Sequence, residues 1–167
     1  LAAVSLLLPA EGEGRNAVYA LQQGWDVICF DQSTAGKDKA LRLAKERAVE
    51  LNQYHIADIR TFESPKLVDA IAYSYVHLPA EFQTAAYARL NSFLKPGGSL
   101  IYEGFSTRNF DKTSGGPKKM DMLMTIEKCF ELFEDFSNVD VWEEEVVLDE
   151  GLYHRGEAVV IRARGTK

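Results

Sequence analysis

The chain has few of the residues that cross-link small folds or bind metals. Its 167 residues include two cysteines and three histidines. Cys29 and Cys129 lie far apart, each inside an apolar pattern, so we interpret both as buried hydrophobic side chains. The histidines have no spacing that fits a metal site, and we expect none. Because no disulfide framework is present, the sequence indicates a reducing environment, and we predict a cytoplasmic protein.

The sequence also lacks a long hydrophobic run and an excess of positive charge. Its apolar runs fall short of the roughly 20 residues that cross a membrane as a helix. The opening run, residues 1–8, lacks the basic flank of a signal peptide, and because it begins without a methionine we expect a preceding segment. The formal net charge is −6, whereas nucleic-acid-binding proteins usually carry a basic surface. We therefore expect neither a membrane nor a nucleic acid as a partner.

The sequence does contain enough apolar residues for a sizeable core. Hydrophobic residues make up 46% of the chain and charged residues 26%, which favours a globular protein over a disordered one. The length suits one domain, residues 1–167, and no internal repeat or low-complexity tract divides it.

Strand-like apolar runs alternate with amphipathic helical patterns along the chain. Strands are expected at residues 1–8, 25–30, 53–57, 67–76 and 99–105, and helices at 16–23, 40–51, 79–94 and 122–133. Two further strands, 139–148 and 157–164, are separated by a hairpin-length connection. This order predicts a Rossmann-like, doubly wound α/β fold in three layers. Its seven-stranded sheet should be mostly parallel and end in an antiparallel C-terminal hairpin.

Polar residues stand at the ends of several of these predicted strands. They are Glu11 to Gly14, Asp31, Asp58, His77 and Glu103. The carboxyl ends of parallel strands meet at one edge of a sheet, where α/β proteins bind their ligands. We therefore expect these residues to surround one ligand crevice.

The glycine-containing turn after the first strand leaves several ligands open. Gly12, Gly14 and Ala17 match a dinucleotide fingerprint, and Asp31 follows at the distance of a ribose-binding acid. This pattern alone is compatible with NAD, with another nucleotide-like ligand, or with a tight turn that binds nothing.

Several motifs together distinguish these possibilities. They are Glu11-Gly-Glu-Gly-Arg-Asn16 with Ala17-Val18-Tyr19, Gly24-Trp25-Asp26-Val27, Asp31-Gln32-Ser33, Ala57-Asp58 and Leu94-Lys-Pro-Gly-Gly98. In these motifs and in the closing hairpin, the chain resembles the class I S-adenosylmethionine-dependent methyltransferases. Within that class it is similar to the small tellurite-resistance-type enzymes. The resemblance covers essentially the whole chain.

The resemblance implies a set of residues that bind S-adenosyl-L-methionine. They are Ala10, Glu11, Gly12, Gly14, Asn16, Asp31, Gln32, Ser33, Asp58, Ile59 and Tyr75. By this resemblance the glycines let the backbone approach the methionine part, and Asp31 accepts hydrogen bonds from the ribose hydroxyls. Gln32 and Ser33 border the ribose and adenine, and Asp58 accepts from the adenine amino group. The Ile59 backbone N–H pairs with a ring nitrogen, and Tyr75 lies near the sulfonium.

The chain departs from the family pattern at two residues of the turn. Leu8 stands where the family often has an acid that anchors the ammonium group, and Ala10 stands where it often has glycine. We consider Glu11 or Glu13 as substitutes for the missing acid. The helical segment that usually precedes the first strand and covers the cofactor is also absent from this sequence.

Methyl transfer from a sulfonium requires alignment more than it requires a fixed catalytic group. The donor is already activated, so the protein mainly supplies proximity and excludes water. We name His77, Tyr153 and His154 as candidate catalytic residues on the acceptor side. The acidic net charge favours a small-molecule acceptor, and the long polar loop 106–121 could bind an anionic one or serve as a mobile lid. A non-catalytic S-adenosylmethionine-binding protein and a nicotinamide-dependent oxidoreductase remain the alternatives.

Overall fold

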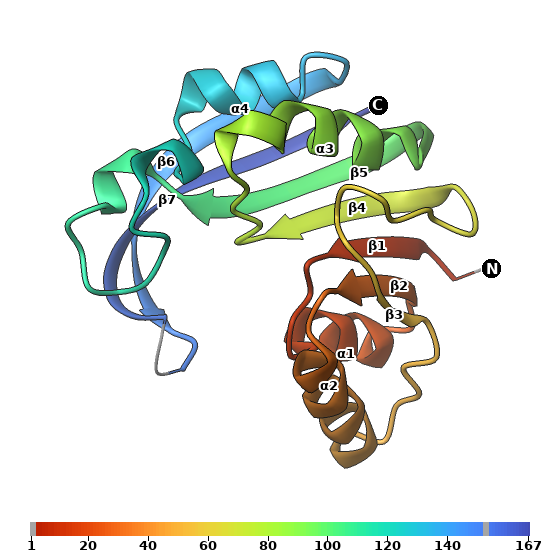
Figure 1. Ribbon diagram of the computed structural model, residues 1–167. Coiled ribbons are helices and arrows are strands. Elements are labelled where there is room, and N and C mark those ends of the chain that lie inside the picture. Colours follow the sequence, from red (N-terminus) through yellow and green to blue (C-terminus); the bar gives the residue numbers. More distant parts are fainter. Residues whose placement is uncertain (1–2, 152–153) are drawn as a thin grey trace. The chain divides into compact units, whose positions relative to one another are not determined.

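The structure is a computed structural model that describes residues 3–151 and 154–167. Seven strands form one sheet in the order β3-β2-β1-β4-β5-β7-β6 (Figure 1). The strands are β1 (Ser5–Pro9), β2 (Asp26–Asp31), β3 (Tyr54–Ile56), β4 (Val68–Ser74), β5 (Leu94–Phe105), β6 (Ser137–Asp149) and β7 (Arg155–Thr166). The helices are α1 (Arg15–Gln22), α2 (Thr34–Glu46), α3 (Ala80–Ser92) and α4 (Ile126–Leu132), with 3-10 turns η1 (Thr107–Asn109) and η2 (Met120–Met122).

The strand pairings confirm the predicted fold class. β1 pairs in parallel with β2 and with β4, and β2 pairs in parallel with β3. β6 and β7 form the predicted antiparallel hairpin at the end of the chain. The chain divides into two compact units, one of residues 1–72 and 89–99 and the other of residues 73–88 and 100–167. Each unit is described separately below, and the single-domain interpretation stays a prediction.

In the first unit, α1 and α2 pack against β1, which precedes the glycine turn, and β2, which follows α1. The apolar stripes of both helices consist largely of alanines, such as Ala17 and Ala40, so the helices lie close to the strands. Leu6, Leu8 and Cys29 supply the strand side of this core. Burying each leucine stabilises the fold by about 1.5–3 kcal/mol.

In the second unit, buried aromatic rings fill the core. Tyr73, Tyr87, Tyr102 and Phe133 are almost fully buried, and their ring centroids lie 4.7–6.5 Å apart. Burial raises the pKa of the three tyrosines above the ordinary value, so their hydroxyls stay neutral.

Three elements differ from the sequence prediction. The second helix, expected at 40–51, is α2 at Thr34–Glu46, because the Ser33 hydroxyl caps it earlier in the chain. The Lys-Pro-Gly-Gly stretch before the fifth strand is not a break, because β5 already begins at Leu94 and runs through it. Gly97 adopts a φ of 75° and takes up the bend. The predicted helix at 122–133 is shorter, since η2 and an extended segment come before α4. Among the described residues, no helix is both long and apolar enough to cross a membrane.

Candidate functional site

The glycine turn leaves β1 with three residues in the left-handed region of backbone space. Ala10, Gly12 and Gly14 have φ angles of 51°, 62° and 82°. This conformation explains why a glycine is expected at position 10, where the chain carries alanine. Two bonds hold the turn: the Glu11 N–H donates to the Phe30 carbonyl (3.1 Å), and the Tyr54 hydroxyl donates to the Gly12 carbonyl (2.5 Å).

The Asp31 carboxylate connects the turn to the next loop. Its Oδ2 accepts from the Gly12 N–H (3.1 Å) and its Oδ1 from the Ser33 N–H (2.8 Å). The Ser33 hydroxyl in turn accepts from the Gly36 N–H at the start of α2 (2.9 Å). Each carboxylate oxygen has two acceptor positions, so Asp31 retains capacity for two more donors. The structure thus brings together the residues predicted to hold a ribose.

The two glycines of the turn have different surroundings. A Cβ at Gly14 would lie 2.4 Å from the Ala40 Cβ, so this glycine is required for close packing against α2. A Cβ at Gly12 would meet no atom within 4 Å, so the space in front of this residue is open. Gly12 is half-buried, and the open space beside its Cα leaves room for the close approach of a small ligand.

Glu11 points toward helix α1. Its carboxylate accepts from the Ala17 N–H (2.7 Å) and from the Asn16 side-chain amide (3.4 Å). Burial raises the pKa of Glu11 to about 7, against these hydrogen bonds, which lower it. Glu11 thus satisfies a donor at the helix N-terminus, while the Asn16 amide donates to the Glu11 carboxylate, and the contact of either residue with a cofactor stays a prediction.

The remaining predicted residues of the first unit lie beside these groups in the sequence but make other contacts. Gln32 is exposed, and Ile59 is buried. Asp58 accepts from the Arg60 guanidinium (2.5 Å) and backbone N–H (2.8 Å), and these bonds lower its pKa to about 2. Leu8 is buried in the core, so β1 provides no carboxylate at that position.

Tyr54 is a site residue that the sequence did not predict. It begins the short strand β3 and is buried. Its hydroxyl bonds the carbonyl of Gly12, while Asp31 bonds the N–H of the same glycine. Burial, with a smaller effect of Asp31, raises the pKa of Tyr54 above its ordinary value, so the hydroxyl remains a donor. The sequence feature that could have identified Tyr54 is its position at the start of the third strand.

In the second unit, four rings form a cluster that we call the Tyr75 cluster: Tyr75, His77, Phe105 and His154. Centroids lie 4.7 Å apart between Tyr75 and Phe105, 4.6 Å between Tyr75 and His154, and 5.6 Å between His77 and Phe105. Tyr75 has a φ of 53° directly after β4, which is strained for a bulky side chain. Its buried Oη forms no hydrogen bond of good geometry within the described residues, and Glu103 is its charged neighbour.

His77 ties two backbone segments together. Its Nε2 accepts from the Phe105 N–H (3.3 Å), which leaves Nδ1 as the donor to the Met122 carbonyl (3.0 Å). Burial lowers the pKa of His77 to about 4, so the ring is neutral. Because both nitrogens are engaged, this geometry supports a positioning role, and the catalytic role named for His77 from the sequence stays a prediction.

Of the other two candidate catalytic residues, His154 is described and stands directly before β7. His154 contacts Tyr75 and Phe105, and its Nδ1 is 3.6 Å from the Glu150 carboxylate. Tyr153 lies outside the described residues.

The long loop after β5 is fixed by side-chain bonds. Asn109 is buried; its Oδ1 accepts from the Val159 N–H (2.8 Å), and its amide donates to the Gly115 carbonyl (3.1 Å). Gly116 packs against Phe105, because a Cβ there would lie 2.9 Å from that ring. These contacts favour a fixed wall beside the Tyr75 cluster over a mobile lid.

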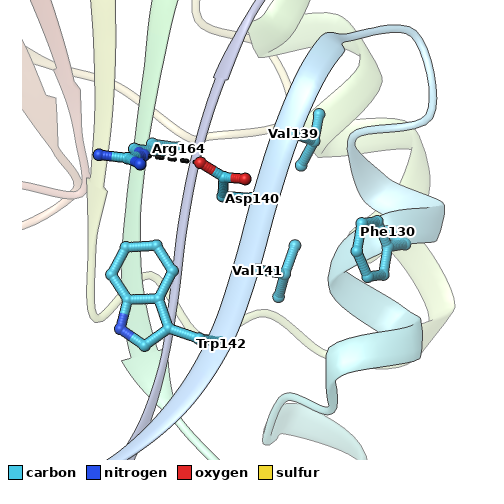
Figure 2. Close-up of a pocket in the computed structure, with 6 residues that line it drawn as sticks. All are labelled: Phe130, Val139, Asp140, Val141, Trp142 and Arg164. Atoms are coloured by element: carbon cyan, nitrogen blue, oxygen red, sulfur yellow. Dashed lines mark hydrogen bonds and ion pairs between the residues drawn. The ribbon is translucent and has the colours of Figure 1, made fainter.

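A groove of about 600 Å³ lies elsewhere, between α4 and β6. Figure 2 shows Phe130, Val139 and Val141 on one side of β6, and Trp142, Asp140 and Arg164 on the other. None of the predicted site residues lines it. The groove is therefore separate from the chemistry described above.

A comparison with protein families decides what kind of protein carries these features. Residues 9–98, more than half of the chain, match the family described as "Methyltransferase domain". The chain belongs to this family. The match includes the glycine turn, Asp31 and Asp58 of this methyltransferase domain, and the resemblance drawn from the sequence is confirmed. No curated protein matches the chain.

Solved structures share the fold of the methyltransferase domain. A protein studied for the conversion of a disulfide bond into a thioacetal group during echinomycin biosynthesis has a TM-score of 0.78 at 14% identity, covering 100% of this chain and 76% of that one. TehB from Haemophilus influenzae has a TM-score of 0.75 at 17% identity, and the match covers 100% of this chain and 58% of that one. The N-methyltransferase NodS from Bradyrhizobium japonicum WM9, in complex with S-adenosyl-L-homocysteine, has a TM-score of 0.72 at 14% identity. The match covers 99% of this chain and 79% of that one. The chain thus spans little more than half of the TehB chain.

Proposed function

We propose that this methyltransferase domain transfers a methyl group from S-adenosyl-L-methionine to a small-molecule acceptor. The observation that carries the proposal is the Asp31 carboxylate, which links Gly12 and Ser33 and still has acceptor positions for two hydroxyls. When bound, the cofactor supplies an activated methyl group on a sulfonium. The family match and the complex of NodS with S-adenosyl-L-homocysteine support the choice of cofactor.

The residues of the first unit would hold and orient this cofactor. The open side of Gly12 would lie against its methionine part, while Asp31 would accept from both ribose hydroxyls. Asp58 and the neighbouring Ile59 backbone would hold the adenine, beside Gln32. Tyr54 would contribute indirectly, because its hydroxyl keeps the Gly12 carbonyl in place. Alignment of this kind can supply much of the rate enhancement in a displacement reaction.

The second unit would supply the acceptor side of the reaction. Tyr75 and His154, whose half-buried rings pack on the buried Phe105, offer aromatic surface, and His77 fixes the neighbouring backbone as a neutral ring. His154 remains the candidate for proton transfer, because its Nδ1 has a carboxylate neighbour in Glu150 and no backbone partner among the described residues. A proton acceptor is needed only for acceptors that are protonated at neutral pH.

Calorimetry on the Asp31→Ala variant tests the cofactor part of this proposal. The wild-type chain is expected to bind S-adenosyl-L-methionine and S-adenosyl-L-homocysteine, and the variant to bind both more weakly by roughly 1.5–3 kcal/mol, the value of hydrogen bonds to a charged group. Asp38→Ala, which removes an exposed carboxylate of α2, serves as the matched control and should bind like the wild type. Equal affinity for Asp31→Ala and Asp38→Ala would mean that Asp31 does not hold the ribose.

The same experiment distinguishes the alternative functions. Binding of NADH in preference to either sulfur compound would favour a nicotinamide-dependent oxidoreductase. Leu8 favours the second alternative, a non-catalytic binding protein, because its burial leaves β1 without an acid for the ammonium group. Screening thiols, halides, metalloid oxyanions and small amines for methylated product separates that alternative from catalysis.

A further inference from the structure

The arginine nearest to Tyr75 is shared between two carboxylates. Arg162 donates from Nε to Glu103 (2.6 Å) and from Nη1 to Glu144 (2.6 Å). Glu103 is also joined to Tyr75 through the backbone, because its carbonyl accepts from the Tyr75 N–H (2.8 Å). One guanidinium neutralises one of the two carboxylates, so this group carries one excess negative charge.

The loop after β5 repeats the same arrangement. Arg108 donates to Glu143 (2.7 Å) and to Glu145 (2.9 Å), and the hydroxyl of Ser106, the residue after Phe105, is a further partner of Glu143. This second group also holds one cation between two anions. Phe105 stands between Glu103 of the first group and Ser106 of the second in the sequence, and each group contributes one excess negative charge to this unit.

Two of the three lysines of the loop are engaged in other contacts. Lys112 forms an ion pair with Glu157 (3.6 Å). Lys118 donates to the Lys112 carbonyl (3.1 Å) and lies 3.5 Å from the Phe110 carbonyl. Lys119 is exposed to solvent. An anion that paired with Arg162 or Arg108 would have to displace an existing carboxylate partner, which costs free energy in a partly buried site.

We propose, building on the methyl transfer proposed above, that the acceptor is an uncharged or cationic molecule with an aromatic or apolar body, and not an oxyanion. Tyr75 and His154, whose rings are half-buried, offer ring surface to such a body, and ring faces attract cations. The two carboxylate-rich groups favour positive charge, and the neutral His77 adds none of its own.

Binding of three size-matched probes tests this charge preference. Benzylammonium, benzyl alcohol and benzoate share one ring and differ in charge. Each is titrated into the protein saturated with S-adenosyl-L-homocysteine while the imidazole proton resonances are followed by NMR. The chain has three histidines, of which His77 and His154 belong to the Tyr75 cluster and His55, on β3, serves as the internal reference.

We expect benzylammonium and benzyl alcohol to shift the resonances of His77 and His154, with His55 unchanged. Benzoate should require a concentration at least about tenfold higher, a difference of about 1.4 kcal/mol. Benzoate binding as tightly as the other two probes would overturn the proposal, and so would the absence of any shift with all three.

A charge variant sharpens the same test. Glu103→Gln leaves Arg162 with only Glu144 as a carboxylate partner, so the preference for benzylammonium over benzoate should fall about tenfold. Glu131→Gln, which removes an exposed carboxylate of α4, is the control and should leave the preference unchanged. An unchanged preference in Glu103→Gln would contradict the role given to this charge.

The result can be separated from failure of the proposed function. Binding of S-adenosyl-L-homocysteine together with a preference for benzoate would overturn only the acceptor class. Failure to bind S-adenosyl-L-homocysteine would contradict the proposed function, while the preference among the three probes can still be measured on the free protein.

Discussion

Residues of the glycine turn that look alike in the sequence have different tasks. Gly14 lies against Ala40 and allows α2 to approach, whereas Gly12 lies against open space. Glu11 satisfies the first turn of α1, although its position beside the glycines predicted a cofactor contact. The sequence shows which residues form a turn, but the direction of each side chain depends on neighbours from α2, β2 and β3. For that reason it predicted Asp31 and missed Tyr54.

The two glycines should respond differently to the same substitution. Gly14→Ala combines a left-handed φ with a Cβ 2.4 Å from the Ala40 Cβ, and we expect it to lower the free energy of unfolding by about 3 kcal/mol. Gly12→Ala adds only the backbone strain, about 1 kcal/mol. Denaturant unfolding of both variants measures the difference. Equal losses would contradict the close packing assigned to Gly14.

Glu11 should make stability depend on pH. Its pKa is raised from 4.5 to about 7 by burial, so the folded chain keeps a proton that the unfolded chain has already released. Stability therefore falls as pH rises from about 4.5 to 7. Glu11→Gln cannot ionise and keeps a carbonyl for the Ala17 N–H, so its advantage over wild type should grow to about 2 kcal/mol at pH 8.

Unfolding curves at pH 5 and pH 8 measure this effect. Glu46→Gln, at an exposed position of α2, is the control and should show the same pH dependence as the wild type. An identical pH dependence for Glu11→Gln would show that the Glu11 carboxyl does not titrate between these limits.

The strands and helices of this chain were largely predictable, and its long loop was not. Alternating apolar and amphipathic stretches depend on local periodicity, which the sequence displays directly. The start of β5 was missed because Pro96 and Gly97 are typical of a break, whereas here Gly97 bends a strand that continues. The order of the loop after β5 arises from Asn109, whose partners Gly115 and Val159 cannot be recognised from composition.

The loop should therefore depend on one buried amide. Asn109→Ala leaves the buried Val159 N–H without its acceptor, and we expect a loss of about 2–3 kcal/mol in the free energy of unfolding. Hydrogen exchange at the Val159 amide should also become faster. Asn52→Ala, at an exposed position, should cost less than about 0.5 kcal/mol. Unchanged exchange at Val159 would indicate that the loop is fixed by other contacts.

The whole molecule has one natural reporter in each of its two units. Trp25 belongs to the first unit and Trp142 to the second, and the chain has no other tryptophan. β4 and β5 each run through both units. If the chain is one domain, as the sequence predicts, both tryptophans should report the same unfolding transition.

Ligand binding should shift that transition as a whole. At a concentration of S-adenosyl-L-homocysteine one hundred times its Kd, the folded state gains about 2.7 kcal/mol, which corresponds to a rise in Tm of about 5–10 °C. Fluorescence melting of Trp25→Phe and Trp142→Phe measures each unit separately. A rise in Tm seen only in Trp142→Phe, the variant that retains Trp25, would show that the two units unfold independently.

The bonds that hold the glycine turn also bear on binding kinetics. Tyr54 and Asp31 fix Gly12 from two sides through contacts within the protein itself. A preorganised turn loses little conformational entropy when a ligand arrives, because the ordering has already occurred during folding. Association should then proceed without a slow rearrangement of the turn, and substitutions at Asp31 should act mainly on the lifetime of the complex.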